Sequence, residues 1–318
     1  MQRCLVVLTL ALGWACRGIA NPPPSSPPPP PPPPPPLPAR SVFPADNAWN
    51  RDIAADSVDP HSDSLIARCG AAASLHPDFG TTYRGAPWGI PFITVLASQP
   101  RVPVTFTYAD ESDPGPYPIP PDAPIEGGPT ASGDRHVLVV DVDNWKLYEL
   151  FDAHPVGGGA SWAAGSGAIF DLASNALRPD GWTSADAAGL PIFPGLARYE
   201  EVAAGRIAHA LRFTCPITRR AYVPPARHFA STQTDSFLPP MGMRVRLKAG
   251  VDISGFPADV QVILTALKTY GMIVADNGGP FFVTGAPDLR WNDADIDTMK
   301  RLHATDFEVV TMRGLVGP

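Results

Sequence analysis

Two runs rich in branched and aromatic residues, separated at Asp143-Asn144, predict a β-hairpin over residues 135–152, RHVLVVDVDNWKLYELFD. The turn falls at Asp143-Asn144, and a two-residue turn fixes which residues of the two strands face each other. That register pairs Val142 with Trp145, Asp141 with Lys146, Val140 with Leu147, Val139 with Tyr148, Leu138 with Glu149, His136 with Phe151 and Arg135 with Asp152. Two of these pairs carry opposite charges, which favours this alignment. We expect the charged pairs on one face, and His136 and Glu149 among apolar side chains on the other.

Other segments predict further strands and a few helices. Runs of branched and aromatic residues predict strands at 90–96, 102–108, 272–275, 281–284 and 307–311. Residues 254–271 carry an apolar stripe at helical spacing, and Gly271 can provide a left-handed C-cap. Asn292 can cap a final helix that extends to about His303. Strands outnumber helices without alternating with them, so we expect a mainly β fold: an antiparallel β-sandwich or jelly-roll-like single domain over residues 41–318, with a few peripheral helices.

The first forty residues indicate export. Arg3 followed by the apolar run 5–14 is typical of a signal peptide, and small residues before Asn21 predict cleavage after Ala20. A lipoprotein anchored through Cys16 is the less favoured alternative, because Trp14 stands where a small residue is required. Residues 21–40 contain fourteen prolines and predict a polyproline II linker that acts as a spacer or, less favoured, as a ligand of proline-binding domains. We expect a secreted or cell-surface protein without a transmembrane segment in the mature chain.

Charge and cysteine content narrow the class of partner. Removing the signal peptide takes away Arg3 and Arg17 and changes the formal net charge from −7 to −9. No basic patch for nucleic acid is apparent, so a polysaccharide or cell-wall glycan is the expected partner.

Only Cys69 and Cys215 remain in the mature chain, either as a disulfide or as two buried thiols. Metal-binding spacings are missing from the sequence, and we expect neither a metal nor another cofactor.

Three carboxylates are the candidate catalytic residues. Glu149 lies on the apolar face of the hairpin, where loss of solvent favours the neutral acid that a general acid requires. Asp171 and Asp186 lie in the loop-rich segment 166–195 and are candidates for the partner carboxylate of a glycosidase. Each also has a structural interpretation: Glu149 at the rim of the sheet, Asp171 bonding loop amides, and Asp186 capping a turn.

Aromatic and basic residues complete the predicted site. Trp162 and Trp182 could stack on sugar rings, and His136, Arg227 and His228 are candidate substrate contacts. By contrast, His209 lies in an apolar run and is expected to be a hydrogen-bonded core histidine.

The segments GDRHVLVVD, LYELFDA, SNALRPDGWTSADAAGLPIFPGL, HALRFT and KTYGMIVADNG…GAPDLRWND resemble a group of exported bacterial proteins described only as hypothetical. The resemblance covers most of the mature domain and implies export and a single-domain organisation. It implies no catalytic residue. We therefore expect an exported carbohydrate-active enzyme, a glycoside hydrolase with paired carboxylates. The alternative is a non-catalytic module that binds glycan or cell wall and is displayed on the proline-rich spacer.

Overall fold

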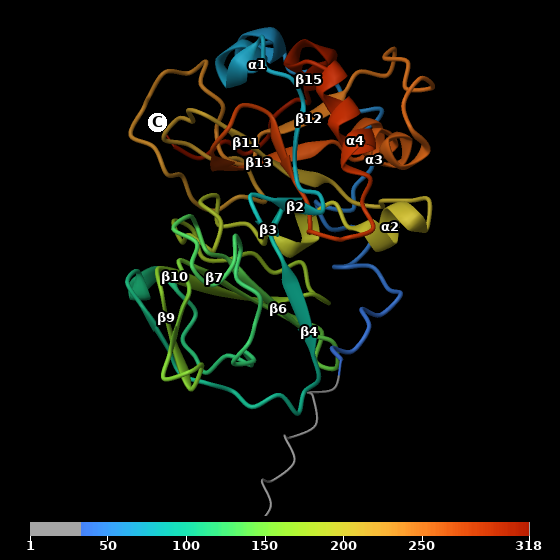
Figure 1. Cartoon of the computed structure of the whole chain (residues 1–318). Coiled ribbons are helices and arrows are strands. Elements are labelled where there is room, and N and C mark those ends of the chain that lie inside the picture. Colours follow the sequence, from blue (N-terminus) through green and yellow to red (C-terminus); the bar gives the residue numbers. More distant parts are fainter. Residues whose placement is uncertain (1–32, 318) are drawn as a thin grey trace, which may run out of the picture. The chain divides into compact units, whose positions relative to one another are not determined.

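A six-stranded sheet and a four-stranded sheet form the frame of the molecule in the computed structural model, which describes residues 33–317 (Figure 1). The predicted signal peptide and most of the proline-rich linker lie outside these residues. The strands of the larger sheet, in spatial order, are β1 (His76–Asp78), β14 (Phe282–Thr284), β11 (Leu211–Cys215), β13 (Met272–Asn277), β12 (Arg244–Leu247) and β15 (Phe307–Val309). The strands of the smaller sheet are β10 (Ser166–Asp171), β7 (Lys146–Phe151), β6 (Val137–Asp141) and β4 (Phe92–Val95).

Short strands and helices surround these two sheets. A three-stranded sheet contains β5 (Val104–Phe106), β9 (Ser161–Ala164) and β8 (His154–Val156), and a two-stranded sheet contains β2 (Thr82–Tyr83) and β3 (Ala86–Pro87). The α-helices are α1 (Ser62–Gly70), α2 (Tyr199–Ala203), α3 (Ala258–Thr269) and α4 (Asp293–Asp297). Within residues 33–317, none of these helices has the length and apolar character needed to cross a bilayer.

The prediction of a mainly β fold with few helices is confirmed. Antiparallel pairs predominate, but β1 with β14, β11 with β13, β4 with β6, and β5 with β9 pair in parallel, so the sheets are mixed. The sandwich or jelly-roll arrangement stays a prediction. The helix predicted over 254–271 is α3, and Gly271 follows it with a φ of +67°. Asn292 caps α4 by accepting hydrogen bonds from the amides of Ala294 and Asp295.

The hairpin of β6 and β7 has the predicted register, with Leu138 opposite Glu149 and Asp141 opposite Lys146. However, both of its faces are buried. Leu138, Val140 and Leu147 pack in the main core, whereas Val137, Val139, Tyr148 and Leu150 pack in a second hydrophobic cluster. The predicted charged face is therefore wrong: Asp141 is 1% exposed and accepts hydrogen bonds from Asn144. The nearly continuous apolar run of β6 is typical of a strand that is covered on both sides.

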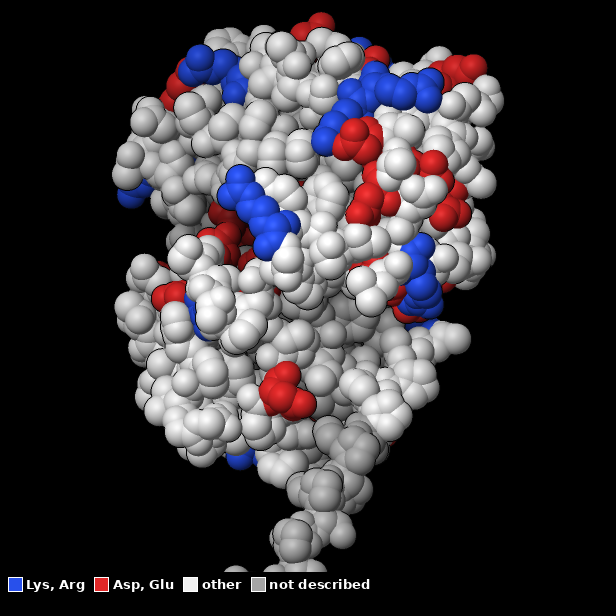
Figure 2. Space-filling view, viewed as in Figure 1, with Lys and Arg blue, Asp and Glu red and all other residues white. Residues whose placement is uncertain are grey.

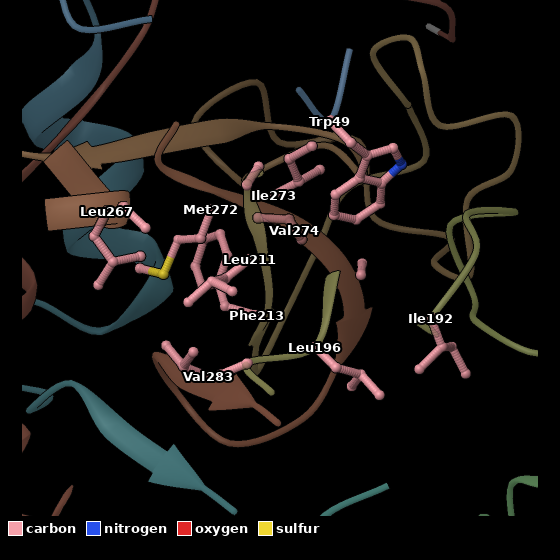
Figure 3. Packing of buried hydrophobic residues seen from close by; sticks show 14 of the residues in the cluster. Trp49, Ile192, Leu196, Leu211, Phe213, Leu267, Met272, Ile273, Val274 and Val283 are labelled. Atoms are coloured by element: carbon pink, nitrogen blue, oxygen red, sulfur yellow. The ribbon is translucent and has the colours of Figure 1, made fainter. Parts of the chain in front are cut away.

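The main core lies between the six-stranded sheet and the elements around it. Figure 3 shows Leu211 and Phe213 of β11, Met272 and Ile273 of β13, and Val283 of β14 packed with Trp49 and Leu267 from outside the sheet. All of these side chains are at most 2% exposed. Ile192, within the loop-rich segment 166–195, and Leu196, immediately after it, belong to the same core.

The end of the proline-rich linker packs against the folded part of the chain. One compact unit begins at Pro34 rather than at residue 41. The Thr94 hydroxyl of β4 donates a hydrogen bond to the Pro35 carbonyl, and the Arg40 guanidinium lies 3.8 Å from the centre of the Trp145 ring. Residues 35–40 are therefore held against the folded part of the chain and do not act as a free spacer.

Cys69 of α1 and Cys215 of β11 form a disulfide, with a Cα–Cα distance of 5.1 Å. The bond joins residues 146 positions apart in the sequence and fastens α1 to the six-stranded sheet. Both sulfurs lie in residues that are fully buried in the main core. A cross-link that closes so long a loop reduces the conformational freedom of the unfolded chain.

We expect the double variant Cys69→Ala/Cys215→Ala to lower the free energy of unfolding by about 2–5 kcal/mol, because the unfolded chain regains the entropy of that loop. Guanidinium titration of wild type and variant measures the difference. Thiol titration of unfolded, unreduced wild type provides the control and should find neither cysteine reactive. An unchanged unfolding midpoint would show that the disulfide does not stabilise the protein.

Candidate functional site

The segment of residues 184–193 is held between the two larger sheets by side chains from both of them. It belongs to the loop-rich stretch 166–195 that stands out in the sequence. Ser184 stabilises the first turn, since its hydroxyl bonds the Leu190 carbonyl and accepts from the Asp186 amide. Gly189 is required at its position because it has a φ of +70° and a Cβ there would lie 2.5 Å from the Trp182 carbonyl oxygen.

Glu149, in the middle of β7, binds this segment from the four-stranded sheet. Its carboxylate accepts hydrogen bonds from the backbone amides of Ile192 (3.0 and 2.9 Å) and Phe193 (2.9 Å). The side chain is 0% exposed. Burial raises the pKa of Glu149 to about 7, and the nearby charge of Asp186 adds to this effect. Glu149 therefore has the raised pKa expected of an acid, but its oxygens are occupied by backbone amides and no solvent reaches them.

Asp186 binds the segment to the six-stranded sheet. Its two carboxylate oxygens accept from Nε (3.0 Å) and Nη2 (2.8 Å) of Arg212 on β11. The remaining Nη1 of Arg212 donates to the Thr284 hydroxyl on β14 at 2.6 Å. Asp186 is 0% exposed and Arg212 is 4% exposed, so this is a buried, bidentate ion pair. Such a pair is a structural contact rather than an available acid or base.

His136, immediately before β6, joins the same segment to a partly exposed carboxylate. Its Nε2 hydrogen bonds the Ala185 carbonyl at 3.0 Å, and its Nδ1 lies 2.6 Å from Glu126. Burial alone would lower the pKa of His136, but the charge of Glu126 more than offsets it and raises the pKa to about 9. For Glu126, burial raises the pKa, but the positive charge of His136 dominates and holds it below its usual value. At neutral pH, His136 is therefore a cation and Glu126 an anion.

Asp276, near the end of β13, completes the group. It is partly exposed, and burial together with the negative charge of Asp186 raises its pKa to about 7. The charges of Arg212 and His136 act in the opposite direction but do not cancel this effect. We call the interacting residues the acidic cluster; its members are Glu126, His136, Glu149, Asp186, Arg212 and Asp276.

Solvent reaches only part of the acidic cluster. Glu126 has a side chain that is 27% exposed and Asp276 is partly exposed, whereas Glu149 and Asp186 are sealed. Figure 2 shows acidic side chains inside a recess between the part of the molecule that carries β11 and β13 and the part that carries β7 and β10. The acidic cluster thus presents two accessible groups to solvent: Glu126, a carboxylate that stays ionised, and Asp276, a carboxyl group that retains a proton near neutral pH.

The remaining predicted site residues lie in different surroundings. Asp171 is exposed at the end of β10 and accepts a hydrogen bond from the Ala173 amide. Trp162 is 1% exposed within the second hydrophobic cluster, so a sugar ring has no access to its face. Trp182 is half-buried beside the Arg178 guanidinium, at 5.6 Å from the ring centre.

The two basic candidates also bind neighbouring parts of the chain. Arg227 forms an ion pair with Asp180 at 2.7 Å. His228 donates from Nδ1 to the Ala187 carbonyl at 2.7 Å, and its Nε2 lies 3.9 Å from Glu111. His209 is confirmed as a buried histidine with hydrogen bonds, to the Ala210 carbonyl and Glu201.

Three members of the acidic cluster were not among the candidates from the sequence. Arg212 lies in the HALRFT segment, and a lone arginine within an apolar run is a signal that it pairs with a buried acid. Asp276 precedes Asn277-Gly278, a pair typical of a turn, although it lies within β13. Glu126 stands in a proline-rich loop without a periodic pattern, and no sequence signal singles it out.

Between residues 33 and 317, the structure gathers no three histidine, cysteine or acidic side chains in a way that could hold a metal ion. Comparison with models of protein families, with curated proteins and with solved structures gives no match to this chain.

We expect Asp186→Asn to lower the free energy of unfolding by about 3–5 kcal/mol, because it leaves the Arg212 guanidinium buried without its counter-ion. Denaturant titration measures this effect. Asp171→Asn is the matched control: that carboxylate is exposed, and its substitution should change the stability by less than about 0.5 kcal/mol. Equal effects of the two substitutions would contradict a structural role for the ion pair.

We expect stability to decrease as pH rises from about 6 to 9. The folded-state pKa of His136 (about 9) lies above its unfolded value, so the stability it contributes is complete below pH 6.5 and is lost as pH rises through 9. The folded-state pKa values of Glu149 and Asp276 are also raised, to about 7, so the stability that these two groups contribute is likewise lost as pH rises through 7. Thermal unfolding across this range measures the trend. In His136→Gln, the decrease above pH 7.5 should be shallower, and an identical curve would contradict the assignment.

Proposed function

We propose that the protein is an exported glycoside hydrolase that acts on an extracellular or cell-wall polysaccharide, with Asp276 as the general acid and Glu126 as the ionised carboxylate. The observation that carries the proposal is the division of the two accessible carboxyl groups: the pKa of Asp276 is raised to about 7, and that of Glu126 is lowered. Glycosidases need one carboxylic acid that donates a proton and one carboxylate that activates water or attacks the sugar.

The neighbours of these two groups support the division of roles. The charges of Asp186 and of Arg212 both act on Asp276, and burial and Asp186 together keep it protonated close to neutral pH. Glu126 is held ionised by His136, whose other ring nitrogen is fixed by the Ala185 carbonyl. Glu149 and Asp186, the carboxylates first expected from the sequence to be catalytic, take the role of positioning residues in this proposal because their oxygens are fully bonded.

The reaction requires little beyond these groups. Asp276 would donate its proton to the oxygen of the leaving sugar while Glu126 acts on the opposite side of the ring, as a nucleophile or as the base for a water molecule. Trp182, half-buried near the Arg178 guanidinium, has an aromatic ring of the kind that packs against sugars.

We expect Asp276→Asn to reduce kcat by about 10²–10⁴-fold on whichever polysaccharide the wild type hydrolyses, because the amide cannot donate a proton as the carboxylic acid does. A panel of neutral and acidic polysaccharides, assayed by release of reducing sugar, measures this effect. Wild-type activity should also fall as pH rises through 7, where Asp276 loses its proton.

Two further variants make this test specific. Glu126→Gln should reduce kcat to a similar extent, and its thermal unfolding reports any loss of the His136 contact. Asp171→Asn should keep wild-type activity, since its carboxylate is exposed and bonds only a local amide. Activity that is equal in wild type, Asp276→Asn and Glu126→Gln, or absent from all three, would overturn the proposal.

The second candidate function is a non-catalytic module that binds glycan or cell wall. The sealing of Glu149 and Asp186 favours it, because it shows that much of the acidic cluster holds the fold together. Binding to an insoluble polysaccharide without release of reducing sugar would support this alternative.

A further inference from the structure

Arg244 of β12 is a buried cation without a carboxylate partner among the described residues. It is 8% exposed, and its guanidinium donates to the backbone carbonyls of Tyr270, Ala48 and Arg51. The ion pairs of residues 33–317 include Arg51 and Arg246 but not Arg244. Burial and the positive charge of Arg51 lower the pKa of Arg244 to about 9. A buried cation in this setting is stabilised by any anion that approaches it.

Arg244 lines a cavity of about 280 Å³ that also contains two other arginines. Arg51 forms an ion pair with Asp56 at 2.7 Å and is 53% exposed, and Arg313 is exposed without an ion-pair partner among the described residues. Asp56 is the only acidic residue among those that line the cavity. Three guanidinium groups and one carboxylate therefore give the cavity a net positive charge in a protein that is acidic overall.

A second cavity of about 270 Å³ adjoins the first, because both are lined by Ala48, Pro224 and Pro225. Its apolar lining includes the small exposed parts of Phe43, Trp49 and Phe170, which are 7%, 2% and 7% exposed. Its polar lining includes Arg178, whose guanidinium donates to Thr183, Asp113 and Glu111, and a chain of hydrogen bonds from Asn47 to Asn175 and from Asn175 to Asp46, whose remaining lone pairs and N–H groups can bond hydroxyls. An apolar wall with a few amide and carboxylate groups suits a sugar ring.

We propose that the two adjoining cavities form a binding site for a sugar that bears an oxyanion, either a carboxylate or a phosphate. The anionic group would lie among Arg51, Arg244 and Arg313, and the ring would extend over Ala48 toward Asn175 in the second cavity. The site shares no residue with the acidic cluster. The proposed binding site does not rest on the proposed hydrolase activity, because the experiment below measures binding and requires no reaction.

Calorimetric titration of the whole chain with D-glucuronate, glucose 6-phosphate and D-glucose tests the proposal. Glucuronate or glucose 6-phosphate should bind saturably and at least about tenfold more tightly than neutral glucose, because charge-assisted hydrogen bonds are the stronger ones. The tighter of the two anions identifies the carboxylate or the phosphate as the preferred group.

Matched variants locate the site. Arg313→Gln and Arg51→Gln should each weaken binding of the preferred anion by about tenfold, whereas Arg301→Gln, an exposed arginine outside both cavities, should leave it unchanged. Asn175→Ala should weaken binding of the sugar anion but should leave binding of inorganic phosphate unchanged, because phosphate has no sugar ring to contact Asn175. The proposal is wrong if neither sugar anion binds saturably, if glucose binds as tightly as they do, or if Arg301→Gln weakens binding as much as Arg313→Gln.

Discussion

The buried ion pair between Arg212 and Asp186 is the contact on which the arrangement of the candidate site depends. Arg212 belongs to the six-stranded sheet and Asp186 to the segment 184–193, which Glu149 of the four-stranded sheet binds through two backbone amides. The segment is thus fixed from both sides. A guanidinium in the core is costly unless it is paired and hydrogen-bonded, and each of the three nitrogens of Arg212 donates to Asp186 or Thr284.

The same pair sets the electrostatics of the groups around it. Burial, together with the negative charge of Asp186, raises the pKa values of Glu149 and Asp276 to about 7. Glu126 instead has its own cation, His136, at 2.6 Å, and this charge holds its pKa below the usual value. One structural ion pair and one histidine therefore separate carboxyl groups of similar chemistry into ionised and protonated forms.

The local elements of the fold could be predicted from the sequence, whereas the partners of the charged residues could not. The register of β6 and β7 followed from a two-residue turn and two pairs of opposite charge, and α3 followed from its apolar stripe and Gly271. The sequence also indicated that Glu149 is desolvated. It could not show that the amides of Ile192 and Phe193, more than forty residues away, would seal that carboxylate. The sequence also could not show that the second hydrophobic cluster covers the other face of the hairpin, because contacts between distant segments leave no periodic pattern in the local sequence.

Rigid anchoring of the segment 184–193 also bears on the two adjoining cavities. Gly189, Leu190 and Pro191 line the second cavity, and all three belong to the anchored segment. Arg178 lines it as well and is held by the Thr183 carbonyl at 2.7 Å. A cavity wall whose backbone is fixed by buried hydrogen bonds and an ion pair exists before any ligand arrives, so little conformational entropy is lost on binding. The contacts that hold this segment to the two larger sheets therefore also preform part of the wall of the second cavity.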